Sequence, residues 1–365
     1  MDFPFQGFNF SGLLRSLLLG SPLLGSRLLG SRLMRCLALS GMLACLLTLF
    51  PLSSLAAVAA PQSPLFTADQ VRIGITPTGW SNSDDPSIDL VPPIGYRQML
   101  SEMALAGYQG TQISGKFPSD LETLKQELAL RNLTISEPWV GTYFSIGDVD
   151  DSIAAFEKQV AFMRSLGETT IVVAELGGAV HQQPVAPLPN RPIFTDAQWD
   201  QVLKGLNDLG RRAKAAGMTL AYHPHVGTGI ETLPDIRRLM EGTDPQGVRL
   251  LLDTGHLLYA GVDPLDVATT YADRIGHVHL KNIRARELKQ AVKQGSSFLD
   301  SIRQGVFTVP GDPEGSIAFE PIFKALASAK YHGWLVVEAE QDPNKANPLQ
   351  YARMARRFLQ ETTGL

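Results

Sequence analysis

From residue 71 onward, short apolar runs rich in β-branched residues alternate with longer stretches whose apolar positions recur every three or four residues. The first pattern predicts buried strands and the second predicts amphipathic helices. Eight strands are predicted, at 71–76, 110–113, 133–137, 170–174, 218–222, 248–252, 275–278 and 334–337. Helices are predicted between them and at the chain end, at 96–106, 119–131, 151–166, 196–216, 233–240, 264–271, 320–329 and 348–362.

Glycines mark several joints between a helix and the next strand, namely Gly107, Gly167, Gly217 and Gly333. A residue without a Cβ atom ends a helix most easily in the left-handed conformation. The regular alternation predicts an α/β protein with a (β/α)8 TIM barrel. A doubly wound open sheet is the alternative, but it would gather functional groups at one crevice instead of on successive strands. Two longer segments, 177–195 and 282–317, are expected to form a substrate lid or wall.

Metal-binding side chains follow the later predicted strands. Because the carboxyl ends of parallel strands meet at one face of a barrel, these side chains are expected to form one site for a divalent ion held by nitrogen and oxygen. Asp253 follows a fully apolar run, where a lone carboxylate is costly to bury, although a helix cap is the alternative. The candidate metal ligands are His223, Asp253, His279 and Glu338, with Glu175 as a ligand or a proton-transfer group.

Other polar residues near the same strand ends are candidates for catalysis. His225, His256 and Lys281 complete the catalytic set with Glu175. Lys281 shares a face with His279 and could hold an enolate oxygen, or could simply be solvated. Packing inside the barrel is the favoured interpretation of His277. Glu340 is expected to lie behind the metal or to contact substrate.

Composition narrows the function classes. Both cysteines, Cys36 and Cys45, lie in the N-terminal segment, so the remainder has no thiol for a disulfide, a metal or a nucleophile. The net charge is −4, and residues 1–60 carry four arginines and one acid, which leaves about −7 for the rest. This mildly acidic body argues against nucleic acid as a partner. Phosphate-binding and dinucleotide motifs and a Gly-x-Ser-x-Gly elbow are absent from the sequence.

Residues 1–60 are treated as separate from the catalytic domain at 61–365. They contain a repeat with a period of five residues, in which each unit begins with Leu-Leu-Gly-Ser. After it, Arg35 precedes an apolar stretch that closes with small residues near Ala59. This order is typical of a secretory signal, and the stretch is also long enough for a membrane anchor. A translation start at Met34 or Met42 is the third interpretation. Any membrane contact is therefore expected only through this segment.

Five segments resemble one known family: HPHVGT at 223–228, LDTGH at 252–256, HVHLK at 277–281, GVFTVPG at 305–311 and GWLVVEAEQDP at 333–343. Together they resemble inosose dehydratases, which belong to the xylose-isomerase-like sugar isomerase and epimerase superfamily of TIM barrels. The resemblance implies a lyase of inositol catabolism that uses Mn or Co, with glutathione as a further cofactor, and a cytoplasmic location. The superfamily's four metal positions correspond to His223, Asp253, His279 and Glu338. The first of these is usually Glu in the epimerases.

The resemblance implies dehydration of 2-keto-myo-inositol (scyllo-inosose) to a trihydroxycyclohexane-1,2-dione through an enediolate. In the expected reaction Glu175 or His256 is the base and His225 or Lys281 is the acid. A metal-dependent ketose isomerase or epimerase is the main alternative, and a sugar-binding protein without activity is another. The expected partner is a small polyol or keto-inositol, and assembly into a homo-oligomer is left open.

Overall fold

The computed structural model describes residues 64–82 and 85–365. The interpretations of residues 1–60 as a signal, an anchor or a late start lie outside the described residues. Among the described residues, no helix combines the length and the apolar character that crossing a bilayer requires.

The central element is a sheet of nine strands, all paired in parallel. Its strands are buried on both faces, as β5 shows with six consecutive buried residues, which explains their uninterrupted apolar runs. In chain order they are β1 Val71–Ile75, β2 Gly110–Thr111, β3 Thr134–Ile135, β4 Trp139–Thr142, β5 Thr170–Glu175, β6 Thr219–Tyr222, β7 Val248–Asp253, β8 Ile275–Leu280 and β11 Gly333–Val337.

The sheet closes into a barrel because its two outermost strands, β3 and β4, are consecutive in the chain. Only Ser136, Glu137 and Pro138 separate them. The Glu137 carbonyl accepts a hydrogen bond from Ile113 N at 3.1 Å, and the Pro138 carbonyl accepts one from Val172 N at 3.1 Å. Residues 134–142 therefore act as one barrel strand, interrupted at a proline that cannot donate to the ladder. The predicted eight-stranded barrel is confirmed.

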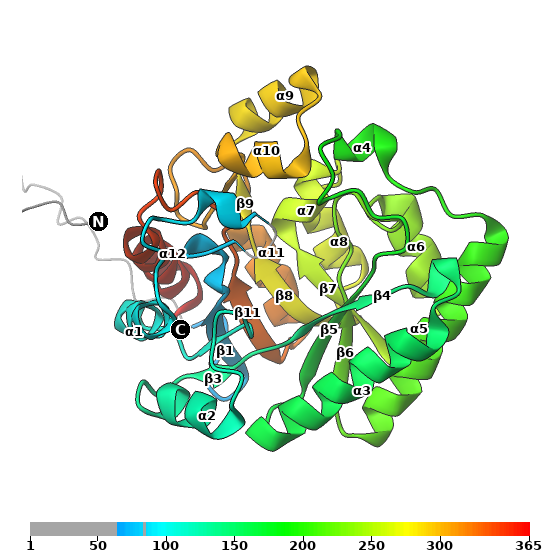
Figure 1. The fold of residues 1–365 in the computed structure, drawn as a ribbon, viewed down its shortest axis with the longest axis horizontal. Helices are drawn as coiled ribbons and strands as arrows, with labels where there is room; N and C mark the ends of the chain where they lie inside the picture. Colours follow the sequence, from blue (N-terminus) through cyan, green and yellow to red (C-terminus); the bar gives the residue numbers. More distant parts are fainter. Residues whose placement is uncertain (1–63, 83–84) are drawn as a thin grey trace, which may run out of the picture. The chain divides into compact units, whose positions relative to one another are not determined.

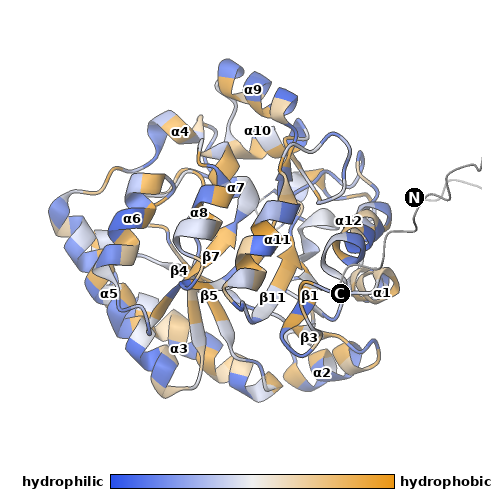
Figure 2. Ribbon diagram, turned by 180° about the vertical axis from the view of Figure 1, so that it is seen from behind, coloured by the Kyte–Doolittle hydropathy of each residue, from blue (hydrophilic) through white to orange (hydrophobic). Residues whose placement is uncertain are grey.

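Helices surround the barrel (Figure 1). Seen from behind, their outer surfaces are largely hydrophilic, whereas the strands inside are largely hydrophobic (Figure 2). The predicted helices are all present, as α1 Tyr96–Ala106, α2 Leu121–Ala129, α3 Val149–Leu166, α5 Asp196–Ala215, α6 Leu233–Gly242, α8 Pro264–Thr270, α11 Phe319–Ser328 and α12 Pro348–Thr363. Gly107 and Gly167 end α1 and α3 at φ of 91° and 74°, the predicted left-handed stops.

The two long segments contain structure that the sequence pattern did not predict. Segment 177–195 includes the short helix α4 Pro187–Asn190. Outside both segments, another helix that was not predicted, α7 Thr254–Tyr259, directly follows β7. Segment 282–317 contains β9 Asn282–Ile283, α9 Ala285–Gln294, α10 Phe298–Arg303 and β10 Phe307–Thr308, with β9 and β10 antiparallel. This insertion has its own apolar cluster, which includes Phe298 and Phe307.

Candidate active site and metal centre

The carboxyl ends of four adjacent strands bring the predicted metal ligands together. His223 follows β6, Asp253 ends β7, His279 lies in β8, and Glu338 follows β11. These four strands are neighbours in the sheet order, so their ends lie side by side at one mouth of the barrel. All four side chains are at least nine-tenths buried. Four polar side chains buried side by side at the barrel mouth indicate a functional site.

The donor atoms of these residues converge. His223 Nε2 lies 3.4 Å from Asp253 Oδ2, and His279 Nδ1 lies 3.7 Å from the same oxygen and 2.9 Å from Glu338 Oε2. Three groups of described residues are compatible with a metal ion: His223–Asp253–His279 and Asp253–His256–Glu338, which share Asp253, and Glu137–His277–His279. Among the described residues, His223 Nε2 and Asp253 Oδ2 are buried without a hydrogen-bond partner. Buried polar atoms normally have partners, so this donor set fits a divalent ion.

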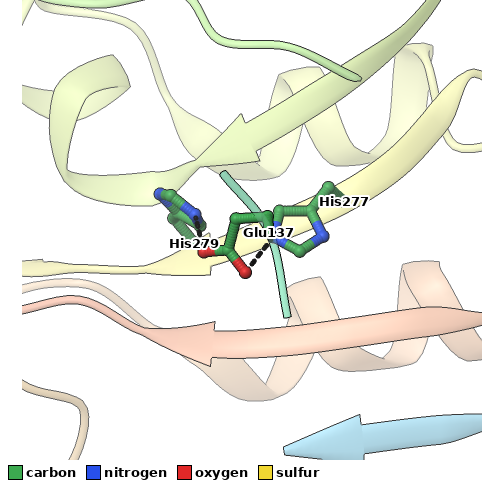
Figure 3. A group of neighbouring side chains, drawn as sticks. All are labelled: Glu137, His277 and His279. Atoms are coloured by element: carbon green, nitrogen blue, oxygen red, sulfur yellow. Dashed lines mark hydrogen bonds and ion pairs between the residues drawn. The ribbon is translucent and has the colours of Figure 1, made fainter. Parts of the chain in front are cut away.

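A further carboxylate, Glu137, lies behind His279. Its Oε1 is 3.2 Å from His279 Nε2, and its Oε2 is 3.4 Å from His277 Nε2. Figure 3 shows the Glu137 carboxylate between the two imidazoles of β8. A carboxylate that accepts from the outer nitrogen of a ligating histidine fixes the tautomer and orientation of that ring. His279 Nδ1 is then left to face Asp253 and Glu338. His277 is buried inside the barrel beside Glu137, and among the described residues its two ring nitrogens have no hydrogen-bond partner.

At His279 and Asp253, charge–charge interactions outweigh the effect of burial on the pKa. Burial alone would lower the pKa of His279, but Glu338, Asp253 and Glu137 raise that pKa well above its ordinary value. Burial alone would raise the pKa of Asp253, but Lys281 and His256 hold that pKa well below its usual range. The carboxylate of Asp253 is therefore ionised, as a metal ligand must be.

Lys281 lies among the carboxylates of the site. Its Nζ is 2.8 Å from Glu340, 3.2 Å from Glu338 and 3.7 Å from Asp253, and its side chain is fully buried. Burial alone would lower the pKa of Lys281, but these three carboxylates raise it. Gly255 makes room for the lysine stem, because a Cβ at that position would lie 2.5 Å from Lys281 Cγ. The solvated alternative for Lys281 is wrong.

Two imidazoles, His225 and His256, lie beside the cluster with ring centroids 3.8 Å apart and ring planes tilted by 38°. His225 Nδ1 lies 2.9 Å from the Val226 carbonyl, which can only accept, so Nδ1 carries the proton and Nε2 has the lone pair. Burial, followed by the charges of His181 and His223, lowers the pKa of His225 well below its ordinary value. His225 is therefore a neutral imidazole whose Nε2 is free of a proton.

Glu175 is not brought into this cluster. Its carboxylate accepts hydrogen bonds from Thr142 Oγ1, Phe144 N, Ser145 N and Oγ, and Gly177 N, at 2.8–3.2 Å. Burial raises its pKa despite these donors. With both oxygens engaged by neighbouring loops, Glu175 lies outside all three groups that could hold a metal. Its position does not support the predicted role as ligand or base.

A cavity of about 170 Å3 opens onto the cluster. His223, His279, Glu338 and Glu340 line it, together with His225. His256 and Lys281 do not, so of the predicted catalytic residues only His225 borders this space. Phe298 and Phe307 of the insertion pack beside His256 and Lys281. The Phe298 ring stacks on His256, and the Phe307 ring lies under the Lys281 ammonium. The insertion thus closes the site on that side with an apolar wall.

The sequence analysis missed two residues of the site, Glu137 and His181. Glu137 ends the third predicted strand, which is the same signal that singled out Asp253 at the end of the sixth. His181 lies in segment 177–195, is buried, and lines the cavity. No local pattern marks it, because its place depends on how that long segment folds back over the barrel mouth.

Comparisons with known proteins agree with this architecture. Residues 100–362 match the family model described as xylose isomerase-like TIM barrel. The chain is 44% identical over 302 residues to an inosose dehydratase of Geobacillus thermodenitrificans (strain NG80-2), and 43% identical over 302 residues to one of Clostridium tetani (strain Massachusetts / E88). Each match covers 82% of this chain and 100% of the relative.

A solved structure shows the same fold at low sequence identity. A xylose isomerase-like TIM barrel protein from Mycobacterium smegmatis, in complex with magnesium, matches with a TM-score of 0.61 and 17% identity. The match covers 82% of this chain and 99% of that chain. The relatives and the family model together settle the classification: this chain belongs to the inosose dehydratase family of hydro-lyases, within the xylose isomerase-like TIM barrels.

Proposed function

We propose that this chain catalyses the metal-dependent dehydration of 2-keto-myo-inositol (scyllo-inosose) to a trihydroxycyclohexane-1,2-dione, a step of inositol catabolism. The curated relatives are named inosose dehydratases, and this chain matches them along their full length. The observation that carries the proposal is the convergence of His223 Nε2 and Asp253 Oδ2, buried and without hydrogen-bond partners among the described residues, beside His279.

Four residues would hold the cation: His223, Asp253, His279 and Glu338. Their two imidazoles and two carboxylates suit Mn or Co, the ions that the family resemblance implies. A structural neighbour with the same fold is in complex with magnesium, which is in keeping with a divalent ion in such a barrel. When bound, the ion supplies Lewis acidity that draws electron density from the ketone oxygen of the substrate. Glutathione remains a prediction.

His225 is assigned to the proton transfer. Dehydration requires removal of the proton on the carbon next to the ketone, and this proton goes to the lone pair of His225 Nε2. The assignment reverses the expected role of His225 as an acid. The reason is the Val226 carbonyl, which accepts a hydrogen bond from Nδ1–H and leaves Nε2 as the nitrogen with the lone pair. His225 also lines the cavity, whereas the expected bases Glu175 and His256 do not.

Lys281 supports the site without bordering the cavity. Its ammonium group offsets the charges of Asp253, Glu338 and Glu340, which would otherwise repel one another in a region without solvent. Its predicted contact with a substrate oxygen is replaced by a contact with Glu340, which does line the cavity. Lys281 therefore orients Glu340 and Glu338 toward the substrate.

The direct test is incubation of the purified chain with scyllo-inosose and Mn2+, with the absorbing dione product followed over time. We expect dione formation that a chelator stops and Mn2+ restores. The variant Asp253→Asn should show no turnover, while Glu122→Gln, an exposed carboxylate on α2, should match the wild type. A change of ketose stereochemistry without loss of water would contradict dehydration and support the epimerase alternative. The cytoplasmic location implied by the resemblance stays a prediction.

A further inference from the structure

Segment 177–195, here called the strap, connects β5 to α5 and lies over the segment that follows β6. Its backbone is joined to that segment where Val180 N donates to the Gly227 carbonyl at 2.8 Å. The approach is close, since a Cβ on Gly227 would lie 3.0 Å from His181 N. Gly227 also has a φ of 79°, which favours glycine. The backbone at His181 is therefore held directly against the barrel mouth.

Both ends of the strap are anchored as well. At its start, Gly177 N donates to Glu175 Oε1 at 3.1 Å. The same oxygen accepts a hydrogen bond from Ser145 Oγ at 2.8 Å. The five hydrogen bonds of Glu175 thus tie the strap to the end of β4, which gives this residue a positioning role. Near its other end, Arg191 pairs with Glu231 at 3.2 Å and with Asp235 at 3.1 Å. Ion pairs with buried partners hold geometry because losing one partner is costly.

The strap delivers one side chain to the cavity of the site, His181. This residue is 5% exposed and lines the same cavity as His225, Glu338 and Glu340. The rings of His181 and His225 meet edge to face with centroids 4.9 Å apart. Two imidazoles outside the proposed ligand set thus border the cavity, His181 from the strap and His225 from the segment after β6. The reaction needs two proton transfers, and His225 accounts for the first.

We propose that His181 is the acid that protonates the hydroxyl group expelled from the substrate. This inference rests on the proposed function. The proton on the carbon next to the ketone moves to His225 Nε2. The electron pair of that C–H bond forms the new carbon–carbon double bond as the C–O bond on the following carbon breaks. His181 gives a proton to the departing oxygen, which leaves as water. The enol product tautomerises to the dione, and the proton on His225 returns to His181 directly or through solvent.

The experiment separates the two proton transfers by running the reaction in D2O with scyllo-inosose and Mn2+. Deuterium incorporation at the carbon next to the ketone measures proton removal by the base. Dione formation also requires the acid, which protonates the departing hydroxyl group. For His181→Asn we expect dione formation to fall about a hundredfold or more, the usual contribution of a positioned acid, while incorporation of deuterium into recovered substrate continues. For His225→Asn we expect both signals to fall together.

Three further measurements make the outcome decisive. His332→Asn, the same substitution at an exposed histidine, should behave as the wild type. Mn2+ affinity, measured by calorimetry, should be unchanged in His181→Asn, and His181→Phe, which keeps an aromatic ring, should repeat its loss of dione. Dione formation within about twofold of wild type, or equal loss of dione and deuterium signals with Mn2+ binding intact, overturns the assignment. Absence of dione from the wild type itself would instead overturn the proposed function.

Discussion

Glu137 Oε1 lies 3.2 Å from His279 Nε2, although the two residues are 142 positions apart in the chain. The strand order explains this contact, because residues 134–142 form the barrel strand that lies opposite β8. From that strand, the Glu137 carboxylate points into the interior of the barrel. The other nitrogen of His279 faces the predicted metal ligands. In the proposed metal centre, Glu137 orients the ligand His279.

Replacing Glu137 with Gln should weaken metal binding. The amide can still accept from His279, but it lacks the charge that strengthens the bond and raises the basicity of the ligating nitrogen. We expect Mn2+ affinity to fall about tenfold to a hundredfold, as is usual for partners behind metal ligands. Calorimetric titration measures this change, with Glu122→Gln as the matched control. Affinity within about twofold of wild type would show that Glu137 has no such role.

Gly255 should not tolerate a side chain. A Cβ there would lie 2.5–2.7 Å from Lys281 Cβ, Cγ and Cδ, and the near end of a side chain fixed by three carboxylates cannot move aside cheaply. We expect Gly255→Ala to lower the free energy of unfolding by about 1–3 kcal/mol, the usual cost of overpacking. Urea denaturation measures it. Gly115→Ala, at an exposed turn where the added Cβ meets nothing within 4 Å, serves as control and should change the free energy of unfolding by less than about 0.5 kcal/mol.

The anchor of the strap should make stability depend on pH. Burial raises the pKa of Glu231 from 4.5 to about 7, even though Gly227 N and Arg191 favour the charged form. Folding therefore favours the protonated carboxyl, so this contribution to stability is complete below pH 4.5 and is lost as pH rises toward 7.

Glu231→Gln removes this titration. Relative to the wild type, we expect the free energy of unfolding of the variant to gain about 1–3 kcal/mol between about pH 4.5 and about pH 8. Urea denaturation of both proteins at several pH values checks the expectation. Parallel pH profiles for the two proteins would mean that Glu231 does not titrate in this range.

The sequence predicted the barrel well because each buried strand carries its own apolar run and each helix its own periodicity. It also predicted which mouth holds the site, since His223, Asp253 and Glu338 directly follow such runs. Pro138 hid the continuation of the third strand as β4, and with it the inward direction of Glu137. Strand-end position alone also could not show that neighbouring loops take up both oxygens of Glu175.

The fine assignment of roles depended on contacts between segments distant in the chain. His225 and Lys281 were both singled out, but the different roles proposed for them rest on the contact of His225 with the Val226 carbonyl and of Lys281 with Glu340. His181 lies in a segment without periodicity, and its place in the cavity comes from the anchors at Gly227 and Arg191. Such contacts arise from tertiary folding, which no local pattern encodes.

The most direct measurement of the central claim is a crystal structure of the chain grown with Mn2+, using the anomalous signal of the metal to locate it. The account predicts one strong peak at the barrel mouth, within bonding distance of His223 Nε2, Asp253 Oδ2, His279 Nδ1 and Glu338 Oε2. A peak at other residues, or none at saturating Mn2+ while these four side chains keep their present contacts, would contradict it.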